Sequence, residues 1–539
     1  MARDRVADLE RLRAIHALAV SGDVARAAQQ ASEALAAGIE HPFLLNLAAT
    51  QLEDAGDLVG ALALLERAVA LAPDDVGALN ALGLCLRRLD RPREALPHLA
   101  RVVALIPHEA FAHASLGDVM LMVGRLADAD ACYVAALERD PRQPIALAGR
   151  ASVARLRGDS VTAARFGAKA LEVMPGLPAA TLAVAAGELA DGQHESAALR
   201  LRALIAAGLM PLDRADALNL LGDVLDAALQ PHLAFVAYQE CNELLRDHYA
   251  SVYVGSLSAS AYASTLLETV QVSPAVPLAS PASETVPPAP AHVFLVGFPR
   301  SGTTLLELIL DGHPDVVTSQ EGEFLLEASV AYLSNPADLS LLQAATDEEL
   351  APYREAYWQA ARAEGVTVDG RVFVDKYPLN ILKLPLIARL FPHARVLLAR
   401  RDPRDVVLSS FRRRFHMSAP FFELLTLDGA ARYYDLVMQL ERAFARRYPL
   451  PTHVVEHERL LDAFEDEMRR ACAFLAIDWT PKMGEFADRA RQRRTATPST
   501  AQLSAGLNRR GLGHWRRYAE EMSPVMPRLA PWVQAFGYE

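Results

Sequence analysis

A glycine-containing segment near the middle of the chain has the residue types of an anion-binding loop. Residues 293–310 read VFLVGFPRSGTTLLELIL, in which Gly297 and Gly302 are five positions apart. This spacing after an apolar run is typical of loops whose backbone N–H groups bind phosphate at the start of a helix. Thr303 replaces the lysine of ATP-binding loops, and a cation comes earlier, at Arg300. The pattern indicates a bound anion other than the γ-phosphate of ATP.

A second segment further along the chain also has side chains that suit phosphate. Residues 399–415 read ARRDPRDVVLSSFRRRF and contain six arginines. Arginine suits phosphate because its planar guanidinium donates paired hydrogen bonds. Arg401 and Ser409 are eight positions apart, and a strand end followed by a helix would bring both to one anion. Arg404 is expected to pair with a nearby acid instead. The chain therefore has two candidate anion sites, and an ATP loop needs only one.

Apolar runs that resemble buried strands lie next to these segments. They occupy residues 292–298, 371–375, 394–400 and 452–458, with helical apolar spacing between them. Strands that alternate with helices predict a parallel sheet with helices on both faces. Ligands bind such sheets at the carboxyl ends of the strands, where FPRSGTT, VDKYP and RRDPRD all fall. We therefore predict a nucleotide-binding α/β domain in the second half of the chain.

The motifs and their order resemble those of one enzyme family. FPRSGTT after a strand, followed by RDPRDVVLSSF, is similar to the 5'-phosphosulfate loop and the 3'-phosphate motif of sulfotransferases that use 3'-phosphoadenosine-5'-phosphosulfate (PAPS). HPDVVTSQE, VDKYP and TPSTAQ occur in the order found in protein-tyrosine sulfotransferases, and the likeness runs from Ala291 to Trp515. The resemblance implies a P-loop-like three-layer α/β fold with a parallel sheet. It also implies PAPS as donor, 3'-phosphoadenosine-5'-phosphate (PAP) as product, and no metal ion.

The resemblance assigns roles to individual side chains. Glu321 corresponds to the base that takes the acceptor proton, with Glu323 as its rival, and Lys376 to the group that stabilises the leaving 5'-phosphate. Arg300 would contact the sulfuryl or bridging oxygens, where charge accumulates during transfer, and Ser499 matches a serine that contacts the reacting group. The implied donor-binding residues are Arg300, Ser301, Gly302, Thr303, Thr304, Arg401, Ser409, Arg413, His457, Ser499, Gln502 and His514.

Departures from the family pattern leave the acceptor open. His514 stands where the tyrosine-specific enzymes carry Lys, His457 where they carry Tyr, and Glu323 where they carry a basic residue. A polypeptide acceptor is favoured, its tyrosine included, and a carbohydrate, lipid or small metabolite is the alternative. Two other functions stay open. The loop spacing allows an ATP-dependent kinase-like enzyme, and the repeats described next allow a non-catalytic scaffold.

The first half of the chain repeats with a period of 34 residues. Glycine or aspartate marks one position of each repeat, alanine follows five residues later, and proline marks a third position. These positions are Gly22, Gly56, Asp90, Gly124, Gly158 and Gly192; Ala27, Ala61, Ala95, Ala129, Ala163 and Ala197; and Pro73, Pro107, Pro141 and Pro175. The pattern resembles the tetratricopeptide repeat, a helical hairpin that buries its apolar face by stacking on its neighbours. It predicts an α-solenoid, with irregular repeats after Gly192 and a turn near Gln230.

The predicted organisation is thus an α-solenoid joined to an α/β domain. Residues 1–268 form the repeats, 269–290 a proline-rich linker, and 291–539 the sulfotransferase domain. A solenoid groove commonly holds an extended peptide, so we favour binding of a protein or peptide acceptor over a role in dimerisation or as a spacer. The family resemblance leaves a homodimer open.

The composition argues against several other classes of function. The net charge of −12 gives no general affinity for nucleic acid. The four cysteines lie far apart without a C-x-x-C pair, which indicates neither a zinc site nor a redox motif. The charged N-terminus lacks the apolar core of a secretory signal, and no apolar run is long enough to cross a membrane. These features predict a cytoplasmic protein without a membrane or nucleic-acid partner.

Overall fold

The computed structural model describes residues 2–254, 258–272, 291–368, 370–492, 506–507, 509 and 511–538, with side chains omitted for 2–7, 491 and 492. The chain forms two compact units. The first comprises Met1–Arg155 and Ser160–Gly187, and the second comprises Leu156–Asp159 and Glu188–Glu539. The linker predicted at residues 269–290 overlaps a helix as far as Val272, and its remainder lies outside the described residues. The domain boundaries at 268 and 291 therefore stay predictions.

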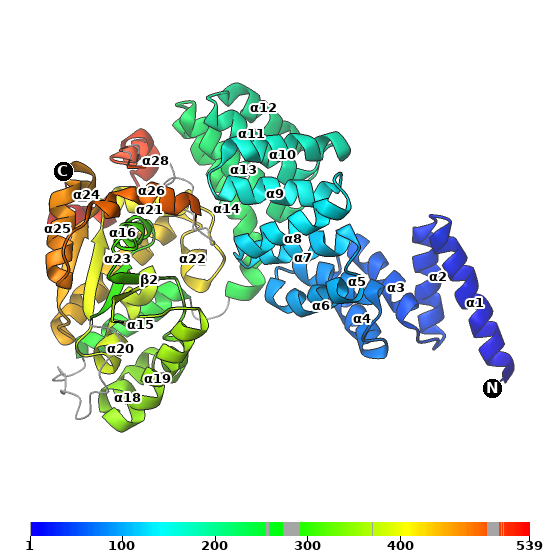
Figure 1. Cartoon of the computed structure of the whole chain (residues 1–539), viewed down its shortest axis with the longest axis horizontal. Helices are drawn as coiled ribbons and strands as arrows, with labels where there is room; N and C mark the ends of the chain where they lie inside the picture. The colour runs from blue at the N-terminus through cyan, green and yellow to red at the C-terminus, as the bar shows by residue number, and fades with distance from the viewer. Residues whose placement is uncertain are drawn as a thin grey trace. The chain divides into compact units, whose positions relative to one another are not determined.

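Paired helices build the first unit, and Figure 1 shows them stacked in chain order. The helices in this part of the chain are α1 (Ala2–Val20), α2 (Val24–Ala36), α3 (Pro42–Asp54), α4 (Leu58–Leu71), α5 (Val76–Arg88), α6 (Pro92–Leu105), α7 (Ala110–Met122), α8 (Leu126–Arg139), α9 (Pro144–Leu156), α10 (Ser160–Val173) and α11 (Pro178–Ala190). The predicted helical-repeat solenoid is confirmed.

The repeat spacing has a direct structural cause at the turns. Five glycines of the 34-residue series have φ between 76° and 89°, and Asp90, which replaces the missing glycine, has φ 56°. Glycine adopts this left-handed conformation without a steric penalty, which allows one helix to end and the next to begin. Asp57 then accepts a hydrogen bond from the Gly60 backbone N–H at 2.9 Å and caps the following helix. The alanines of the series are small enough to be fully buried where the helices meet, as at Ala27 and Ala61.

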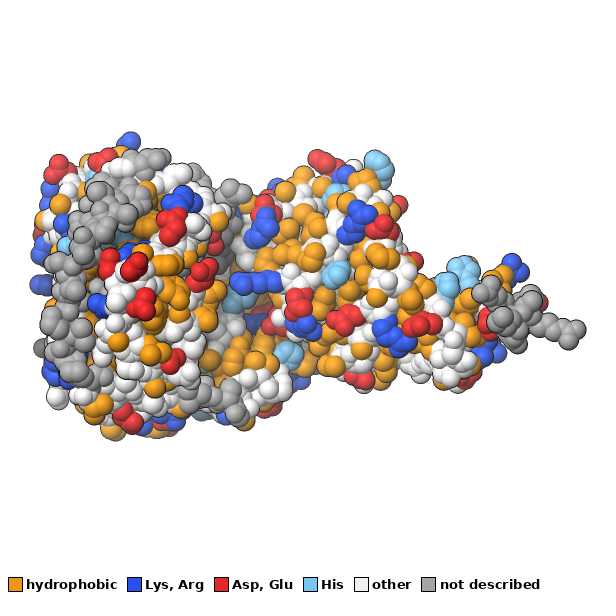
Figure 2. Space-filling model, turned by 90° about the horizontal axis from the view of Figure 1, so that it is seen from below, with side chains coloured by type: hydrophobic (Ala, Val, Ile, Leu, Met, Phe, Trp, Pro, Cys, Tyr) orange, Lys and Arg blue, Asp and Glu red, His pale blue; other side chains and the backbone are white. Residues whose placement is uncertain are grey.

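Exposed ion pairs also join neighbouring repeats. Arg67 contacts Glu40 at 2.6 Å, and Arg101 contacts Asp74 at 2.8 Å, each pair 27 residues apart in the chain. Basic and acidic side chains are interspersed over the repeats on the face that Figure 2 shows. Each such exposed pair contributes only about 0–1 kcal/mol, so apolar packing provides most of the stability.

Four more helices precede the sheet and belong to the second unit. They are α12 (His194–Ala206), α13 (Pro211–Ala227), α14 (Pro231–Tyr253) and α15 (Ala259–Val272). Leu229 has φ 59°, and Gln230 is the N-cap of α14, so the turn predicted near Gln230 is confirmed. Helix α15 packs against α23 (Leu427–Arg447) of the α/β region.

A five-stranded parallel sheet forms the centre of the second unit. Its strands are β1 (His292–Gly297), β2 (Val316–Gln320), β3 (Val372–Lys376), β4 (Arg395–Arg400) and β5 (Thr452–Glu456), in the order β2-β3-β1-β4-β5. The predicted parallel α/β sheet is confirmed, and four strands lie where they were expected. The fifth, β2, was missed because VVTSQ is short, half-exposed and rich in polar residues.

Helices cover both faces of this sheet, and β1 is buried along its whole length. Leu295 packs on one face with α16 (Thr303–Leu310), whereas Phe294 packs on the other face against Tyr357 of α19 (Asp347–Ala363). Alternate residues of a strand point to opposite faces, which is why a strand buried on both sides reads as a continuous apolar run.

The remaining elements of the second unit complete these layers. The α-helices are α17 (Leu326–Tyr332), α18 (Leu339–Ala344), α20 (Leu384–Leu390), α21 (Pro403–Phe411), α22 (Ala419–Glu423), α24 (His457–Asp462), α25 (Phe464–Leu475), α26 (Phe486–Gln492), α28 (Ala519–Met522) and α29 (Met526–Ala535). The 3-10 helices are η1 (Pro336–Asp338), η2 (Pro378–Lys383), η3 (Pro481–Glu485) and η4 (His514–Tyr518).

The described residues contain neither a membrane-spanning helix nor a cluster of metal ligands. Within the described ranges, no helix combines the length and the apolarity needed to cross a membrane. In the same part of the chain, no group of three or more His, Cys, Asp or Glu side chains is arranged to hold a metal ion. All four cysteines are free thiols.

Candidate active site

The carboxyl ends of the five parallel strands each lead directly to a side chain singled out from the sequence. Parallel strands place these ends along one edge of the sheet, which is where ligands bind in this class of fold. The residues, in strand order β1 to β5, are Arg300, Glu321, Lys376, Arg401 and His457. The register places Gln320 and Leu295 on either side of Lys376, and Arg400 opposite Glu456.

The loop after β1 requires both of its glycines. A Cβ atom at Gly297 would lie 2.6 Å from the Ser301 Oγ and 2.7 Å from the Ala399 carbonyl oxygen. Gly302 has φ 104°, and a Cβ there would lie 2.9 Å from the His457 Nδ1. No side chain caps the N-terminus of α16, where Thr303 and Thr304 are buried. The first N–H groups of this helix are thus arranged to donate to an anion.

Two buried polar atoms beside this loop have no protein partner. Neither the Ser301 Oγ nor the His457 Nδ1 has a hydrogen-bond partner in the described structure. Burial, together with the charges of Arg401 and Arg300, lowers the pKa of His457 to about 3, so the ring is neutral at neutral pH. Buried polar groups are normally hydrogen-bonded, and these two atoms are available to a ligand in the loop.

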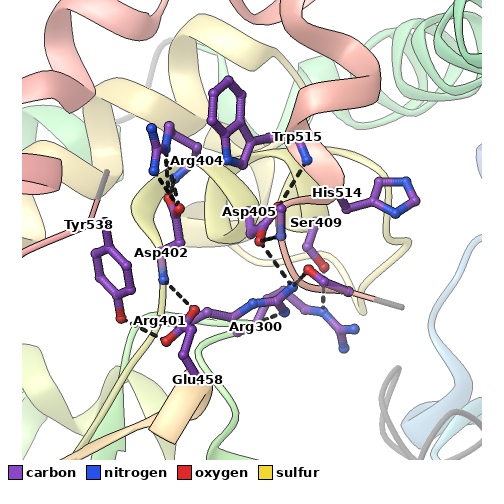
Figure 3. Close-up of polar contacts among 12 residues, drawn as sticks. Arg300, Arg401, Asp402, Arg404, Asp405, Ser409, Glu458, His514, Trp515 and Tyr538 are labelled. Atoms are coloured by element: carbon purple, nitrogen blue, oxygen red, sulfur yellow. Dashed lines mark hydrogen bonds and ion pairs between the residues drawn. The ribbon is translucent and has the colours of Figure 1, made fainter. Parts of the chain in front are cut away.

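Figure 3 shows the two predicted anion-binding segments in direct contact. The Arg300 Nε donates to the Ser409 Oγ at 3.1 Å, and the Arg401 Nη1 donates to the Arg300 carbonyl oxygen at 3.4 Å. Arg401 also donates to the Gly511 carbonyl oxygen, while its buried Nε has no partner. The structure therefore brings Arg300, Arg401 and Ser409 together, although their roles stay predictions.

Positive charges concentrate around Arg300. Burial and the neighbouring charges of Arg413, Arg401 and Arg412 lower the pKa of Arg300 to about 9. Each of these factors disfavours the charged guanidinium. An anion bound among these arginines would offset their mutual repulsion and favour the charged form of Arg300. Such a concentration of positive charge is expected of a phosphate-binding site.

The helix that carries Ser409 is fixed at its N-terminal end by two aspartates (Figure 3). Asp402 accepts hydrogen bonds from the Arg404 Nε at 3.0 Å, its Nη2 at 2.7 Å and its backbone N–H at 2.9 Å, so the predicted pairing of Arg404 with an acid is confirmed. Asp405 accepts from the backbone N–H groups of Gly513 at 2.7 Å and Trp515 at 2.9 Å. The contacts of Asp405 attach the segment after residue 510 to α21.

Glu321 and Lys376 form an ion pair at the ends of β2 and β3. The Lys376 Nζ lies 2.6 Å from the Glu321 Oε1, and the Glu321 backbone N–H donates to the Lys376 carbonyl oxygen at 2.9 Å. The Lys376 side chain is fully buried, whereas 40% of the Glu321 side chain is exposed. An acid that contacts a buried cation and also faces solvent can receive a proton from an incoming hydroxyl.

Neighbouring acids are placed differently. Glu323 is exposed and accepts a hydrogen bond from the Tyr377 hydroxyl at 3.4 Å. Asp375 does not contact Glu321 or Glu323, and its carboxylate accepts hydrogen bonds from Tyr357 at 2.8 Å and Ser319 at 3.4 Å. It adjoins Lys376 in β3, and successive strand residues point to opposite faces. The ion pair with Lys376 therefore favours Glu321 over Glu323 as the base.

The other predicted site residues fall into two groups. Arg413 and His514 contact aspartates of α13, Asp223 at 2.9 Å and Asp226 at 3.1 Å. Ser499 and Gln502 lie outside the described residues. The acids of α13 were missed by sequence reasoning. The only sequence signal for them is their helical spacing, which indicates a shared face but no partner.

Comparison with known proteins assigns the α/β region to a class. Residues 290–481 match the family model described as the sulfotransferase family. Residues 290–481 therefore contain the sulfotransferase-family domain that the motifs predicted.

Individual relatives are similar to part of this chain. An uncharacterized protein from Aquifex aeolicus (strain VF5) is 27% identical over 253 residues, which cover 45% of this chain and 32% of that protein. Protein-tyrosine sulfotransferase 1 of Danio rerio is 27% identical over 269 residues, which cover 46% of this chain and 72% of that protein. The chain thus spans about a third of the length of the Aquifex relative.

A solved structure also resembles the chain over its helical part. It is a tetratricopeptide repeat protein from Parabacteroides merdae ATCC 43184, with 16% sequence identity and a TM-score of 0.35. The superposition covers 44% of this chain and 93% of that chain.

Proposed function

We propose that this protein transfers a sulfuryl group from PAPS to a hydroxyl acceptor on a protein or peptide. The observation that carries the proposal is the hydrogen bond between Arg300 of the first anion-binding segment and Ser409 of the second. A donor with phosphate groups at both its 5' and 3' positions needs two joined anion sites. The match of residues 290–481 to the sulfotransferase family supports the same chemistry.

The donor would occupy the strand-end site through both of its charged ends. The N–H groups at the start of α16, with Thr303 and Thr304, would bind the 5'-phosphosulfate. Arg401 and Ser409 would bind the 3'-phosphate, because the guanidinium supplies paired donors and the hydroxyl a third. The buried His457 Nδ1, which has no protein partner, supplies a further polar contact beside the loop.

The transfer step forms one bond and breaks another. The acceptor oxygen attacks sulfur, the bond between sulfur and the bridging oxygen breaks, and that oxygen leaves with its electron pair on the 5'-phosphate. Glu321 takes the acceptor proton. Arg300 and Lys376 stabilise the negative charge that develops on the transferred group and on the leaving phosphate.

In the structure, the ammonium group of Lys376 contacts the carboxylate of Glu321. We infer that the negative charge of the donor attracts the ammonium group of Lys376 towards the leaving oxygen. Glu321 would then lose its ion pair with Lys376, and its carboxylate would be free to accept the proton of the acceptor hydroxyl. This coupling favours donor binding before proton transfer from the acceptor.

The acceptor class is the less constrained part of the proposal. A relative named as a protein-tyrosine sulfotransferase supports a polypeptide acceptor, and stacked helical repeats commonly bind extended peptides. A kinase-like use of ATP is the second candidate, because of the glycine spacing in the loop. The threonine in place of the phosphate-binding lysine disfavours it.

Calorimetric titration with PAP tests the donor assignment. We expect binding without Mg²⁺, and a loss of about tenfold or more in affinity in Arg401→Ala or Ser409→Ala, because each removes a hydrogen bond to a charged group. Arg446→Ala is the matched control, since Arg446 is exposed at the end of α23. Failure of PAP to bind, or a clear preference for ATP with Mg²⁺, would reject the proposal.

A further inference from the structure

Helix α13 carries polar side chains at a spacing that places them on one face. Asp216, Asn219, Asp223 and Asp226 are separated by three, four and three residues. Residues at this spacing lie above one another on a helix. Three acids on one helix face repel one another unless cations face them, so this face requires a basic partner.

The basic partner is the run of three arginines that follows α21. The arginines pair with aspartates of α13 in antiparallel order, and Arg412 additionally lies 3.8 Å from Asp223. The pairs are Arg412 with Asp226 at 2.8 Å, Arg413 with Asp223 at 2.9 Å, and Arg414 with Asp216. Most of these side chains are at least three-quarters buried, with only the Asp216 side chain (43%) and, marginally, that of Arg414 (26%) more exposed. Shielded pairs of this kind fix geometry more firmly than exposed pairs do.

Asparagines of α13 and of the following helix α14 donate hydrogen bonds to carbonyl groups at the C-terminal end of α21. The Asn219 Nδ2 donates to the Arg412 carbonyl oxygen, and the Asn242 Nδ2 of α14 donates to the Phe411 carbonyl oxygen, both at 2.9 Å. Carbonyl groups at the end of a helix lack partners within the helix, so these side chains act as its C-terminal caps. Phe235 of α14 also stacks on Phe411, with ring centroids 5.1 Å apart.

Asp226 additionally joins the C-terminal segment to this cluster. It accepts from the Tyr518 hydroxyl at 2.8 Å and contacts the His514 Nε2 at 3.1 Å. Burial raises its pKa, but the His514 hydrogen bond and the Arg412 charge outweigh burial and keep the pKa below its usual range. Asp226 is therefore a charged group shared by Arg412, His514 and Tyr518.

These contacts extend to the predicted 3'-phosphate site. Ser409 lies on α21, two residues before Phe411, and its hydroxyl accepts from Arg300. Among the charges that act on Arg300, those of Arg413, Arg401 and Arg412 are the largest. Two of these three residues, Arg412 and Arg413, form ion pairs with aspartates of α13. A change on α13 therefore reaches the donor site through the arginines that follow α21.

We propose that the last helical hairpin, α13 and α14, is a positioning element of the donor site, in which Asp223 and Asp226 hold Arg413 and Arg412 for the 3'-phosphate. The inference rests on the proposed function. The hairpin would then help the second unit to distinguish nucleotides with a 3'-phosphate from those without one. This role is separate from any binding of an acceptor by the repeats.

Titration of the whole 539-residue chain with two nucleotides tests the inference. PAP carries the 3'-phosphate, and adenosine 5'-phosphate lacks it. We expect Asp223→Asn and Asp226→Asn each to weaken PAP binding about tenfold and to change binding of adenosine 5'-phosphate less than about twofold, because each variant removes one partner of a charge pair next to the 3'-phosphate site only. Asp216→Asn is the matched control. It breaks the third pair, through Arg414, and should leave both affinities unchanged.

The outcomes separate positioning from a purely structural role. An equal loss of affinity for both nucleotides, or unchanged or tighter PAP binding in the Asp223 and Asp226 variants, overturns the inference alone. Because adenosine 5'-phosphate also reports an intact loop after β1, its retained binding shows that a variant is folded. If the wild-type chain does not bind PAP, the proposed function and the inference fail together.

Discussion

Arg300 and Glu321 share a backbone conformation that residues other than glycine rarely adopt. Their φ angles are 72° and 57°. Glu321 directly follows β2, and Arg300 is three residues after the end of β1. Such left-handed positions cost on the order of 1–3 kcal/mol and persist where surrounding contacts enforce them. Here the Ser409 hydroxyl fixes Arg300, and Lys376 fixes Glu321 at both its backbone and its side chain. The strained residues include Arg300, which we propose stabilises the charge on the sulfuryl group, and Glu321, which we propose accepts the acceptor proton.

The choice between two neighbouring glutamates is testable at this scale. We expect Glu321→Gln to slow sulfuryl transfer by about 10²- to 10⁴-fold, the usual contribution of a positioned general base. Glu323→Gln should change the rate only a few-fold, because Glu323 contacts Tyr377 rather than Lys376. Initial rates with labelled PAPS and a common acceptor pool give the comparison. A larger loss in the Glu323 variant would reverse the assignment.

At the scale of elements, β3 separates two buried ionisable residues onto opposite faces. Lys376 faces Glu321 at the strand-end site, whereas Asp375 faces Tyr357, whose hydroxyl also lies 2.7 Å from the His292 Nε2. Burial is the largest cause that raises the pKa of Asp375, to about 7. The protonated acid is therefore favoured in the folded chain at mildly acidic pH.

Asp375 should make stability depend on pH. Its folded pKa of about 7 lies above its ordinary value of 3.8, so the folded chain binds the proton more tightly than the unfolded chain. The resulting stabilisation is complete below pH 3.8 and is lost as the pH rises through about 7. We expect Asp375→Asn, which cannot ionise, to lessen the fall in the free energy of unfolding across this window. Urea unfolding at several pH values measures it, and equal slopes in both proteins would contradict the prediction.

The elements also show why the site was only partly predictable from sequence. The motif after β1 and the Arg401–Ser409 spacing were recognisable because local spacing determines what one strand end and one helix can present. β2 was not recognisable, since its stability comes from pairing with β3 rather than from an apolar pattern of its own. The contacts of Asp223 and Asp226 with Arg413 and Arg412 depend on tertiary packing between segments far apart in the chain, which no local pattern encodes.

At the scale of the whole molecule, the proposed donor site belongs to one of the two compact units. The proposed donor site uses residues of the second unit only, including the helical hairpin of α13 and α14. The first unit consists of stacked helices whose buried alanines and leucines form its own apolar clusters. Repeats of this kind are stabilised chiefly by contacts with their nearest neighbours.

Destabilising the first unit should therefore leave donor binding intact. Leu99 is fully buried in the first unit, and Leu99→Ala should cost about 2–5 kcal/mol of stability there. We expect unchanged PAP affinity in this variant at temperatures where it is folded. Leu408→Ala, at an equally buried position on α21, is the control that should weaken both stability and PAP binding. Weaker PAP binding in Leu99→Ala would show that the two units are coupled.

The most direct test of the central claim follows the sulfuryl group itself. The 539-residue chain is incubated with PAPS labelled with ³⁵S and a cell lysate as the acceptor pool, and the label is then located after the nucleotides are removed. The proposed function predicts label on a polypeptide fraction, no need for ATP, and little transfer by Glu321→Gln. Label that stays on the nucleotide, or that appears only as inorganic sulfate, would contradict it.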